Sequence, residues 1–123
     1  MAPYEKLQAW KLSYDLVREV YRTTASFPKQ ELYGITSQIR RAAFSIVLNI
    51  AEGSAKRGPR ELRRYLDISL GSLSELTCAL RLAHDLEFLP ANEFIRLEKL
   101  RNHAGTVLWK LYRAVERRGG NSL

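Results

Sequence analysis

The chain has 123 residues, of which 46% are hydrophobic, so it is long enough for one domain with its own core and too apolar to be disordered. Its formal net charge of +7 favours nucleic acid or an anionic membrane surface as a partner. The single cysteine excludes an internal disulfide, and no apolar run reaches the ~18–20 residues of a membrane span. We therefore expect a cytoplasmic protein with no signal peptide and no place in a membrane.

The first helical pattern covers residues 5–26. Apolar and aromatic residues recur there at steps of three and four, which places them on one helix face: Leu7, Trp10, Tyr14, Val17 and Tyr21. The pattern ends at Phe27, because the residue before a proline is pushed out of the α region. The spacing predicts a helix that buries this face.

A second helix is predicted over residues 31–55. Its main apolar stripe consists of Ile35, Ile39, Ala42, Ile46, Ile50 and Gly53. Phe44 and Leu48 lie roughly opposite this stripe at ~100° per residue, and Val47 lies between. A helix that is apolar all round either sits unusually deep in its own chain or meets another subunit with its outer face. We favour the second interpretation, which makes Phe44, Val47 and Leu48 a predicted oligomer interface.

The third and fourth helices follow short breaks in the pattern. Gly58 suits a left-handed helix stop and Pro59 suits the first turn of a new helix over residues 59–88. That helix carries a heptad seam of Leu62, Leu66, Ser69, Leu73, Leu76, Leu80 and Ala83. Residues 92–118 carry the fourth pattern, and residues 119–123 are expected to be a frayed tail.

Four helices with short connections place consecutive helices side by side and antiparallel. The spacing therefore predicts one all-α domain over residues 1–123, an up-down-up-down antiparallel four-helix bundle.

Most of the net charge lies in the stretch from Ile35 to Tyr65. Seven cations stand there against Glu52 and Glu61, a net of 7 − 2 = +5: Arg40, Arg41, Lys56, Arg57, Arg60, Arg63 and Arg64. Those after Gly58 cluster at a helix N-terminus, where the macrodipole disfavours cations but favours a phosphate. The arginine side chain also forms forked contacts with phosphate oxygens. We predict that all seven contact nucleic acid; the alternative is a solvated cluster that only aids solubility.

Catalytic and metal-binding patterns are absent from the sequence. His84 and His103 are the only histidines, and neither belongs to a Glu-x-x-His pair of the kind that holds iron in helix bundles. Cys78 is expected to be a packed small residue. Asn49 and Glu52 are assigned structural roles, Glu52 as the partner of an arginine. We expect no enzyme activity, no catalytic residue, no metal and no cofactor.

A long segment resembles a known family. FPKQELYGITSQIRRAAFSIVLNIAEGSAKRG, followed by E-x-x-x-YLDISLGSLSEL, is similar to the four helix bundle proteins encoded by intervening sequences of bacterial 23S rRNA genes. The same family includes the accessory variability determinant of diversity-generating retroelements. The resemblance implies a homopentamer with a basic surface suited to RNA or DNA, and in the retroelement branch a reverse transcriptase as partner. It brings no catalytic residues.

Two functions follow from these observations. The first is a non-catalytic, oligomeric protein that binds the RNA or DNA backbone through the turn between the second and third helices. The alternative is a protein-interaction scaffold or accessory subunit, for example for a reverse transcriptase.

Overall fold

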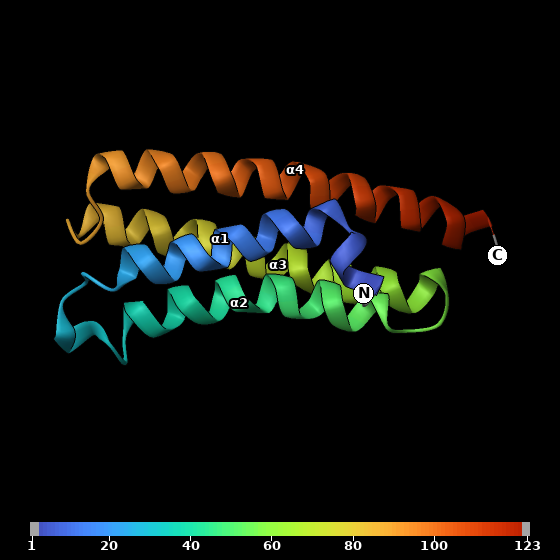
Figure 1. Cartoon of the computed structure of the whole chain (residues 1–123), viewed down its shortest axis with the longest axis horizontal. Coiled ribbons are helices and arrows are strands. Elements are labelled where there is room, and N and C mark those ends of the chain that lie inside the picture. The colour runs from blue at the N-terminus through green and yellow to red at the C-terminus, as the bar shows by residue number, and fades with distance from the viewer. Residues whose placement is uncertain (1–2, 122–123) are drawn as a thin grey trace.

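The computed structural model describes residues 3–121, except the side chains of residues 5, 6, 120 and 121. Within this range the chain forms two short 3-10 helices and four long α-helices: η1 (Pro3–Lys6), α1 (Gln8–Thr24), η2 (Lys29–Glu31), α2 (Ile35–Ser54), α3 (Gly58–Asp85) and α4 (Ala91–Asn121). The long helices lie along one axis (Figure 1), and each packs against two neighbours, in the cyclic order α1, α2, α3, α4. The predicted all-α four-helix bundle is confirmed. None of the described helices is both long and apolar enough to cross a membrane.

The helix ends depart from the predicted ones by a few residues. α3 ends at Asp85 instead of residue 88, because Glu87 adopts a φ of 65° and the N–H of Phe88 bonds the carbonyl of Ala83 at 2.9 Å. α4 continues to Asn121, so Gly119 is helical and not part of a frayed tail. A glycine costs a helix about 1 kcal/mol but does not by itself end it. Residues 122–123 of the expected tail lie outside the described residues.

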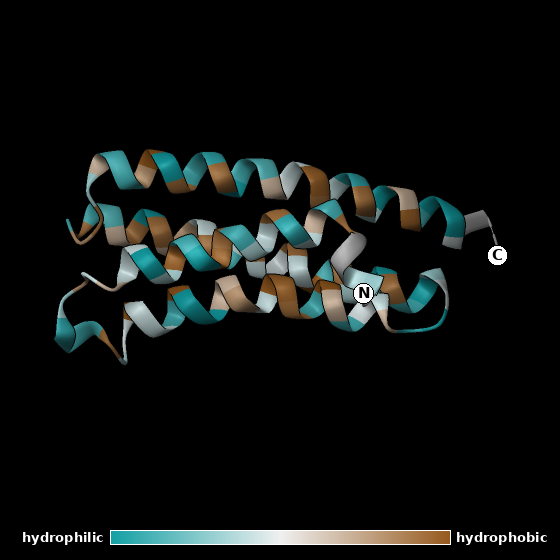
Figure 2. Ribbon diagram, viewed as in Figure 1, coloured by the Kyte–Doolittle hydropathy of each residue, from teal (hydrophilic) through white to brown (hydrophobic). Residues whose placement is uncertain are grey.

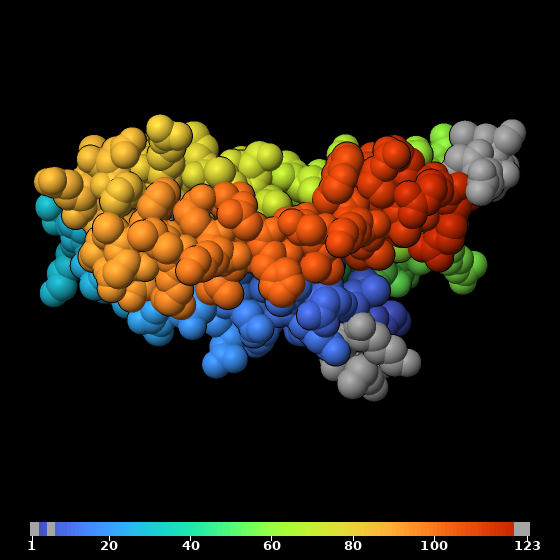
Figure 3. All heavy atoms as spheres, turned by 90° about the horizontal axis from the view of Figure 1, so that it is seen from above, coloured from blue at the N-terminus to red at the C-terminus, as the bar shows by residue number. Residues whose placement is uncertain are grey.

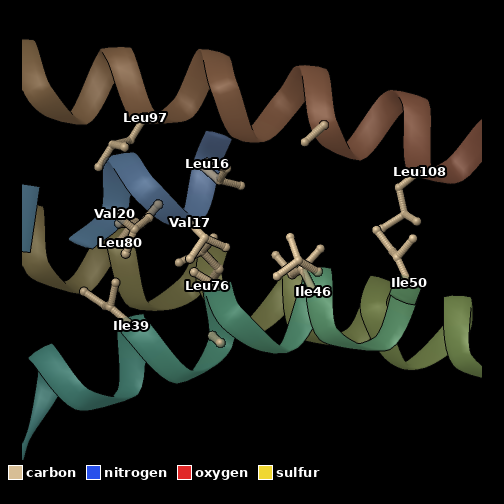
Figure 4. Packing of buried hydrophobic residues seen from close by; sticks show 14 of the residues in the cluster. Leu16, Val17, Val20, Ile39, Ile46, Ile50, Leu76, Leu80, Leu97 and Leu108 are labelled. Atoms are coloured by element: carbon tan, nitrogen blue, oxygen red, sulfur yellow. The ribbon is translucent and has the colours of Figure 1, made fainter. Parts of the chain in front are cut away.

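The core lies on the axis of the bundle and receives branched side chains from every α-helix. Figure 4 shows these side chains pointing toward one another between the ribbons: Leu16 and Val20 from α1, Ile39, Ile46 and Ile50 from α2, Leu76 and Leu80 from α3, and Leu97 and Leu108 from α4. The heptad seam predicted on α3 is buried or packed against this core. It belongs to the chain's own interior.

The face predicted for α1 is buried only in part: Val17 belongs to the core and Leu7 and Trp10 pack against it, but the two tyrosines do not. Tyr14 and Tyr21 are each 43% exposed, whereas Ala9, Ser13 and Leu16 are buried. The small side chains of Ala9 and Ser13 let α1 approach its neighbours, and the tyrosine rings remain at the edge. A tyrosine is apolar enough to enter a stripe but has a hydroxyl that favours water.

The outer face of α2 holds two of the three residues predicted to meet another subunit. Phe44 and Leu48 are each 48% exposed, but Val47 is only 4% exposed and belongs to the chain's own core. α2 is flanked by α1 on one side and α3 on the other, so its buried arc is wide enough to include Val47. The interpretation of Val47 as an outer-face residue was therefore wrong.

Small and polar residues join α2 to α3 at close range. The Ser69 hydroxyl donates to the carbonyl of Ile46 at 2.9 Å, and the hydroxyls of Ser45 and Ser72 lie 2.7 Å apart. The Asn49 amide donates to the carbonyl of Ser45 at 2.8 Å, which gives this half-buried side chain the structural role expected for it. The Ser69–Ile46 and Ser45–Ser72 bonds join α2 to α3 and fix how the two helices lie against each other.

An ion-pair network joins α1 to α4. Arg96 bridges Glu19 at 3.0 Å and Glu93 at 2.8 Å, and Arg22 bridges the same two carboxylates at 2.7 and 3.2 Å. Hydrogen bonds from Arg22, and then from Arg96, hold the pKa of Glu19 below its ordinary value, although partial burial acts in the opposite direction. The pKa of Glu93 is lowered chiefly by its hydrogen bond from Arg96.

We expect the free energy of unfolding to fall as the pH drops below about 4.3, the ordinary pKa of a glutamate. A carboxylate whose pKa is lowered by folding stabilises the fold above that pH and loses the effect as the pH falls through its folded pKa. Glu93→Gln should reduce this acid dependence, measured as urea midpoints between about pH 6 and about pH 3. Glu75→Gln, at an exposed glutamate with no ion pair among the described residues, is the control. The same acid dependence in Glu93→Gln and wild type would contradict the prediction.

Candidate nucleic-acid interface

The turn between α2 and α3 places five of the seven predicted cations at one end of the bundle. We call this set the basic end: Lys56, Arg57, Arg60, Arg63 and Arg64. Gly58 makes the reversal possible with a φ of +83°, a backbone region that residues with a Cβ rarely adopt, and Pro59 follows in the first turn of α3. Figure 2 shows the turn as a hydrophilic segment, and Figure 1 shows it at the same end as both labelled termini.

The start of α3 has the electrostatic features of an anion site. Arg57 occupies the N-cap position, and no side chain accepts a hydrogen bond from the first free N–H groups. The positive end of the helix dipole and the arginines therefore point to the same kind of ligand, an anion. A helix start optimised for stability alone would carry an acidic or hydroxyl cap.

Three of the five cations are free of acidic partners. Among the described residues, Arg57, Arg60 and Arg63 form no ion pair. Lys56 lies 3.8 Å from Glu52, so Glu52 pairs with a lysine and not with an arginine as expected. Arg64 lies 3.4 Å from Glu61. Both pairs are exposed, and such pairs contribute little to stability and break readily.

Tyr65 adds an aromatic ring to the basic end. The guanidinium carbon of Arg64 lies 4.5 Å from the centre of this ring, and the Lys56 ammonium lies 5.5 Å from it. These cation–π contacts hold two long side chains near the surface of α3. They lower the entropy that Lys56 and Arg64 would lose on meeting a phosphate.

Arg40 and Arg41 lie apart from the basic end. Arg41 lies on α2, fifteen residues before Lys56. At the rise of an α-helix this separates the two residues by about 22 Å along the bundle. Arg40 is half-buried and ties α2 to α1: it donates to the Thr24 hydroxyl at 2.9 Å and lies over the Tyr21 ring at 4.7 Å. The structure thus divides the seven predicted contacts into one cluster of five and a separate pair, one of which already has a place in the fold.

A groove between α3 and α4 continues from the basic end. It has a volume of about 640 Å³, with Arg60, Arg63 and Arg64 on the α3 wall and Tyr112 and Glu116 on the α4 wall. Sequence reasoning missed the α4 side because it considered only the buried stripe of that helix. The signal available was Trp109, Tyr112 and Arg113 at spacings of three and four, which place an aromatic pair and a cation on one face.

The opposite end of the α2–α3 surface is apolar. A groove of about 580 Å³ is lined there by Ile35, Ala79, Leu82 and Leu86, with carboxylates at its rim. Cys78 also lines it and is exposed, so the expectation that this cysteine is packed was wrong. Acidic rims repel phosphate, so nucleic acid would bind at the basic end and not here.

His84 is a packing residue at the end of α3. Its ring stacks on Phe94 with centroids 4.4 Å apart, and Nδ1 lies 3.0 Å from the carbonyl oxygen of Leu89. Within the described part of the chain, no three residues among the histidines, cysteines and acids come together in a group able to hold a metal ion.

A known family matches the part of the chain that holds the basic end and most of the bundle. The model of the family described as 23S rRNA-intervening sequence protein matches residues 5–110, which include α1, α2, α3 and the larger part of α4. Among curated proteins, none matches the chain in sequence. The match agrees with the resemblance drawn from the motifs around Arg40 and Asn49, and it carries the intervening-sequence description without distinguishing a retroelement branch. With 106 of its 123 residues covered by this match, the chain belongs to the 23S rRNA-intervening sequence protein family.

Proposed function

We propose that this protein binds RNA or DNA through backbone phosphates at the basic end, as an oligomer and without catalysis. One observation carries the proposal: Arg57, Arg60 and Arg63 have no acidic partner among the described residues and surround a helix start without a side-chain cap. Cations at that position cost the fold a few tenths of a kcal/mol each, a cost that a bound phosphate reverses. The family's link to 23S rRNA genes is compatible with a nucleic-acid partner.

The proposed binding is weakly dependent on base sequence. The basic end offers guanidinium groups and free backbone N–H groups, which position a protein on phosphates but do not read bases. An oligomer would repeat the basic end on every subunit and raise the overall affinity through multivalency. Binding to RNA and DNA of mixed sequence should therefore be similar.

The test is a fluorescence-anisotropy titration of labelled single-stranded RNA and DNA with the wild-type protein at several salt concentrations. Each phosphate neutralised contributes about 0.7 to the slope of log K against log salt for a single strand. With three free arginines we expect a slope of about −2 or steeper for both nucleic acids. No measurable binding, or an affinity that does not change with salt, would refute the proposal.

The oligomer is proposed to form through the outer face of α2. Phe44 and Leu48 are half-exposed on α2, and Ile68 is 42% exposed on α3. The bond from Ser69 to Ile46 and the bond between the hydroxyls of Ser45 and Ser72 put Leu48 level with Ile68 along the two helices. The three side chains thus contribute to one apolar surface for a second copy, and the family resemblance sets the expected number of copies at five.

Phe44→Glu/Leu48→Glu should convert the oligomer into monomers, because two charges would be buried in the contact without partners. Light scattering at micromolar concentration measures the mass directly. Ile95→Glu, at a residue 55% exposed on α4, is the matched control and should leave the mass unchanged. A stable monomer of the wild type would disprove the oligomer.

A second function is favoured by the apolar groove at the other end of the α2–α3 surface. Leu82 and Leu86 are about half exposed there, a burial site for another protein's apolar side chain. The protein would then be a scaffold or an accessory subunit, for example of a reverse transcriptase. A pull-down from nuclease-treated lysate separates the two functions: a partner retained after nuclease favours the scaffold, and one that is lost favours nucleic acid.

A further inference from the structure

We propose that the groove between α3 and α4 binds single-stranded nucleic acid by stacking an unpaired base on Trp109 while Arg60 and Arg63 hold adjacent phosphates. This inference rests on the proposed function and names its substrate class, a single strand in preference to a duplex. It assigns a binding role to α4, which the basic end does not include. Figure 3 shows α4 running along one face of the molecule between α3 and α1.

Trp109 is a half-exposed aromatic side chain held between neighbours on α4. Its ring is half-exposed although tryptophan is the side chain with the most to gain from burial. Tyr112 stacks against it, with centroids 5.5 Å apart and an angle of 18° between the planes. The guanidinium carbon of Arg113 lies 5.8 Å from the same ring and is held by Glu116 at 2.7 Å. The ring is thus fixed by its neighbours, so it would lose little entropy when a base stacks on it.

The cations of α3 are within reach of this ring. A Cβ added at Gly105 would come within 2.8 Å of the Leu73 Cδ2 atom, so these two residues lie at about the same height on the antiparallel helices α4 and α3. Trp109 lies four residues after Gly105, and Ser69 lies four residues before Leu73, so Trp109 and Ser69 are at about the same height. Along α3, Arg63 is then about 9 Å and Arg60 about 14 Å from that height. Tyr112, stacked on Trp109, lines the groove that holds Arg60 and Arg63. A strand can therefore place a base on the ring and its neighbouring phosphates on these arginines.

The acids of the groove form no ion pair with Arg60 or Arg63 among the described residues. Glu61 pairs with Arg64, and Glu116 pairs with Arg113. Asp67 also lines the groove but forms no ion pair among the described residues. Asp67 would repel a phosphate placed beside it, so the phosphates would contact Arg60 and Arg63 at the side of the groove nearest the start of α3.

A single strand fits this arrangement better than a duplex. The bases of a duplex are paired and stacked on one another, so their faces cannot reach a ring on the side of a helix. An unpaired base can turn its face to the protein, and stacking on an aromatic side chain tolerates any base. This fits a groove lined by Arg60, Arg63 and the ring of Tyr112, which is stacked on Trp109.

The experiment uses the full chain and a labelled oligouridine of about 12 nucleotides, with an RNA duplex of the same length for comparison. Trp109→Leu should weaken oligouridine binding by about 5- to 100-fold and leave the salt slope unchanged, because a stacking contact is lost and no phosphate contact. Duplex affinity should not change. Trp109→Phe should keep most of the affinity. Tyr14→Leu, at an exposed stacked ring on α1, should behave as wild type.

Tryptophan fluorescence gives a second measurement, which reports contact with Trp109 even if the variants bind as tightly as the wild type. Oligouridine should quench the wild type, and Trp109→Phe should abolish the quenching even though Trp10 remains. Equal affinity of Trp109→Leu and wild type for the oligouridine, or an equal loss for single strand and duplex, would overturn the stacking. If Trp109→Leu binds as the wild type does but reversing the arginines of α3 still weakens binding, the phosphate contacts are supported and the stacking on Trp109 is not. If the wild type binds neither probe, both proposals fall.

Discussion

Reversing four arginines of the basic end, Arg57/Arg60/Arg63/Arg64→Glu, is expected to weaken binding to single-stranded RNA by about a hundredfold or more at moderate salt. The slope of log K against log salt should fall in magnitude by about 2 to 3, since each lost phosphate contact with a single strand removes about 0.7. The cause is local: three of the four side chains form no ion pair among the described residues, and all four surround the start of α3. Anisotropy titrations of the wild type and the variant measure both quantities.

The control variant carries the same change in charge at the other end of the bundle. Arg18/Lys29/Arg81/Lys99→Glu replaces four cations that form no ion pair among the described residues, and both variants take the formal net charge from +7 to 7 − 8 = −1. It should lose much less affinity than the variant of the basic end. If both variants weaken binding equally, the whole charge of the protein attracts the nucleic acid and the basic end is not a site.

Gly53→Ala is expected to destabilise the fold by roughly 1–3 kcal/mol, although alanine is the better helix former by about 1 kcal/mol. A Cβ at this position would come within 2.8 Å of the Tyr65 Cβ and 3.0 Å of a Leu62 methyl carbon. The Tyr65 Cβ is fixed to the backbone of α3, so the two helices themselves would have to separate. Urea unfolding at a fixed protein concentration measures the change in free energy.

The same substitution at Gly71 should have the opposite sign. A Cβ at Gly71 meets no atom within 4 Å, so Gly71→Ala should stabilise the helix by up to about 1 kcal/mol. The pair compares one chemical change in two surroundings, one at a close helix contact and one in open space. A Gly53→Ala protein as stable as the wild type would show that α2 and α3 do not approach each other this closely.

The number of helices and the places where the chain reverses were predictable because their signals are local, whereas the exact helix ends were not. Pro28, Gly58 and Pro90 interrupt the apolar spacing and mark three chain reversals, and a left-handed glycine is readable from its neighbours. The faces were less predictable. Tyr14 is apolar enough to fit a stripe yet remains at the edge of α1, and Val47 is buried because α2 has neighbours on two sides. Spacing shows that a helix has an apolar face, but the neighbouring helices decide how wide the buried arc is.

The candidate site was predictable only where its residues are close in sequence. Lys56 to Arg64 are neighbours in the chain, so their clustering needed no tertiary information. The contact of Arg40 with Thr24 joins two helices, and the groove that brings Tyr112 to Arg63 exists only because α4 packs antiparallel on α3. No spacing in the sequence encodes these distances. The site is therefore a local basic turn extended by a tertiary groove.

The most direct test of the central claim is to locate the nucleic acid on the protein by photocrosslinking. A single-stranded RNA carrying 4-thiouridine would be crosslinked to the wild-type chain, and mass spectrometry of the digested protein would identify the attached peptides. We expect crosslinks between Lys56 and Tyr65, in the α2–α3 loop and the start of α3, and on α4 near Trp109. Crosslinks confined to the other end of the bundle, around Lys29 and Lys99, would contradict it.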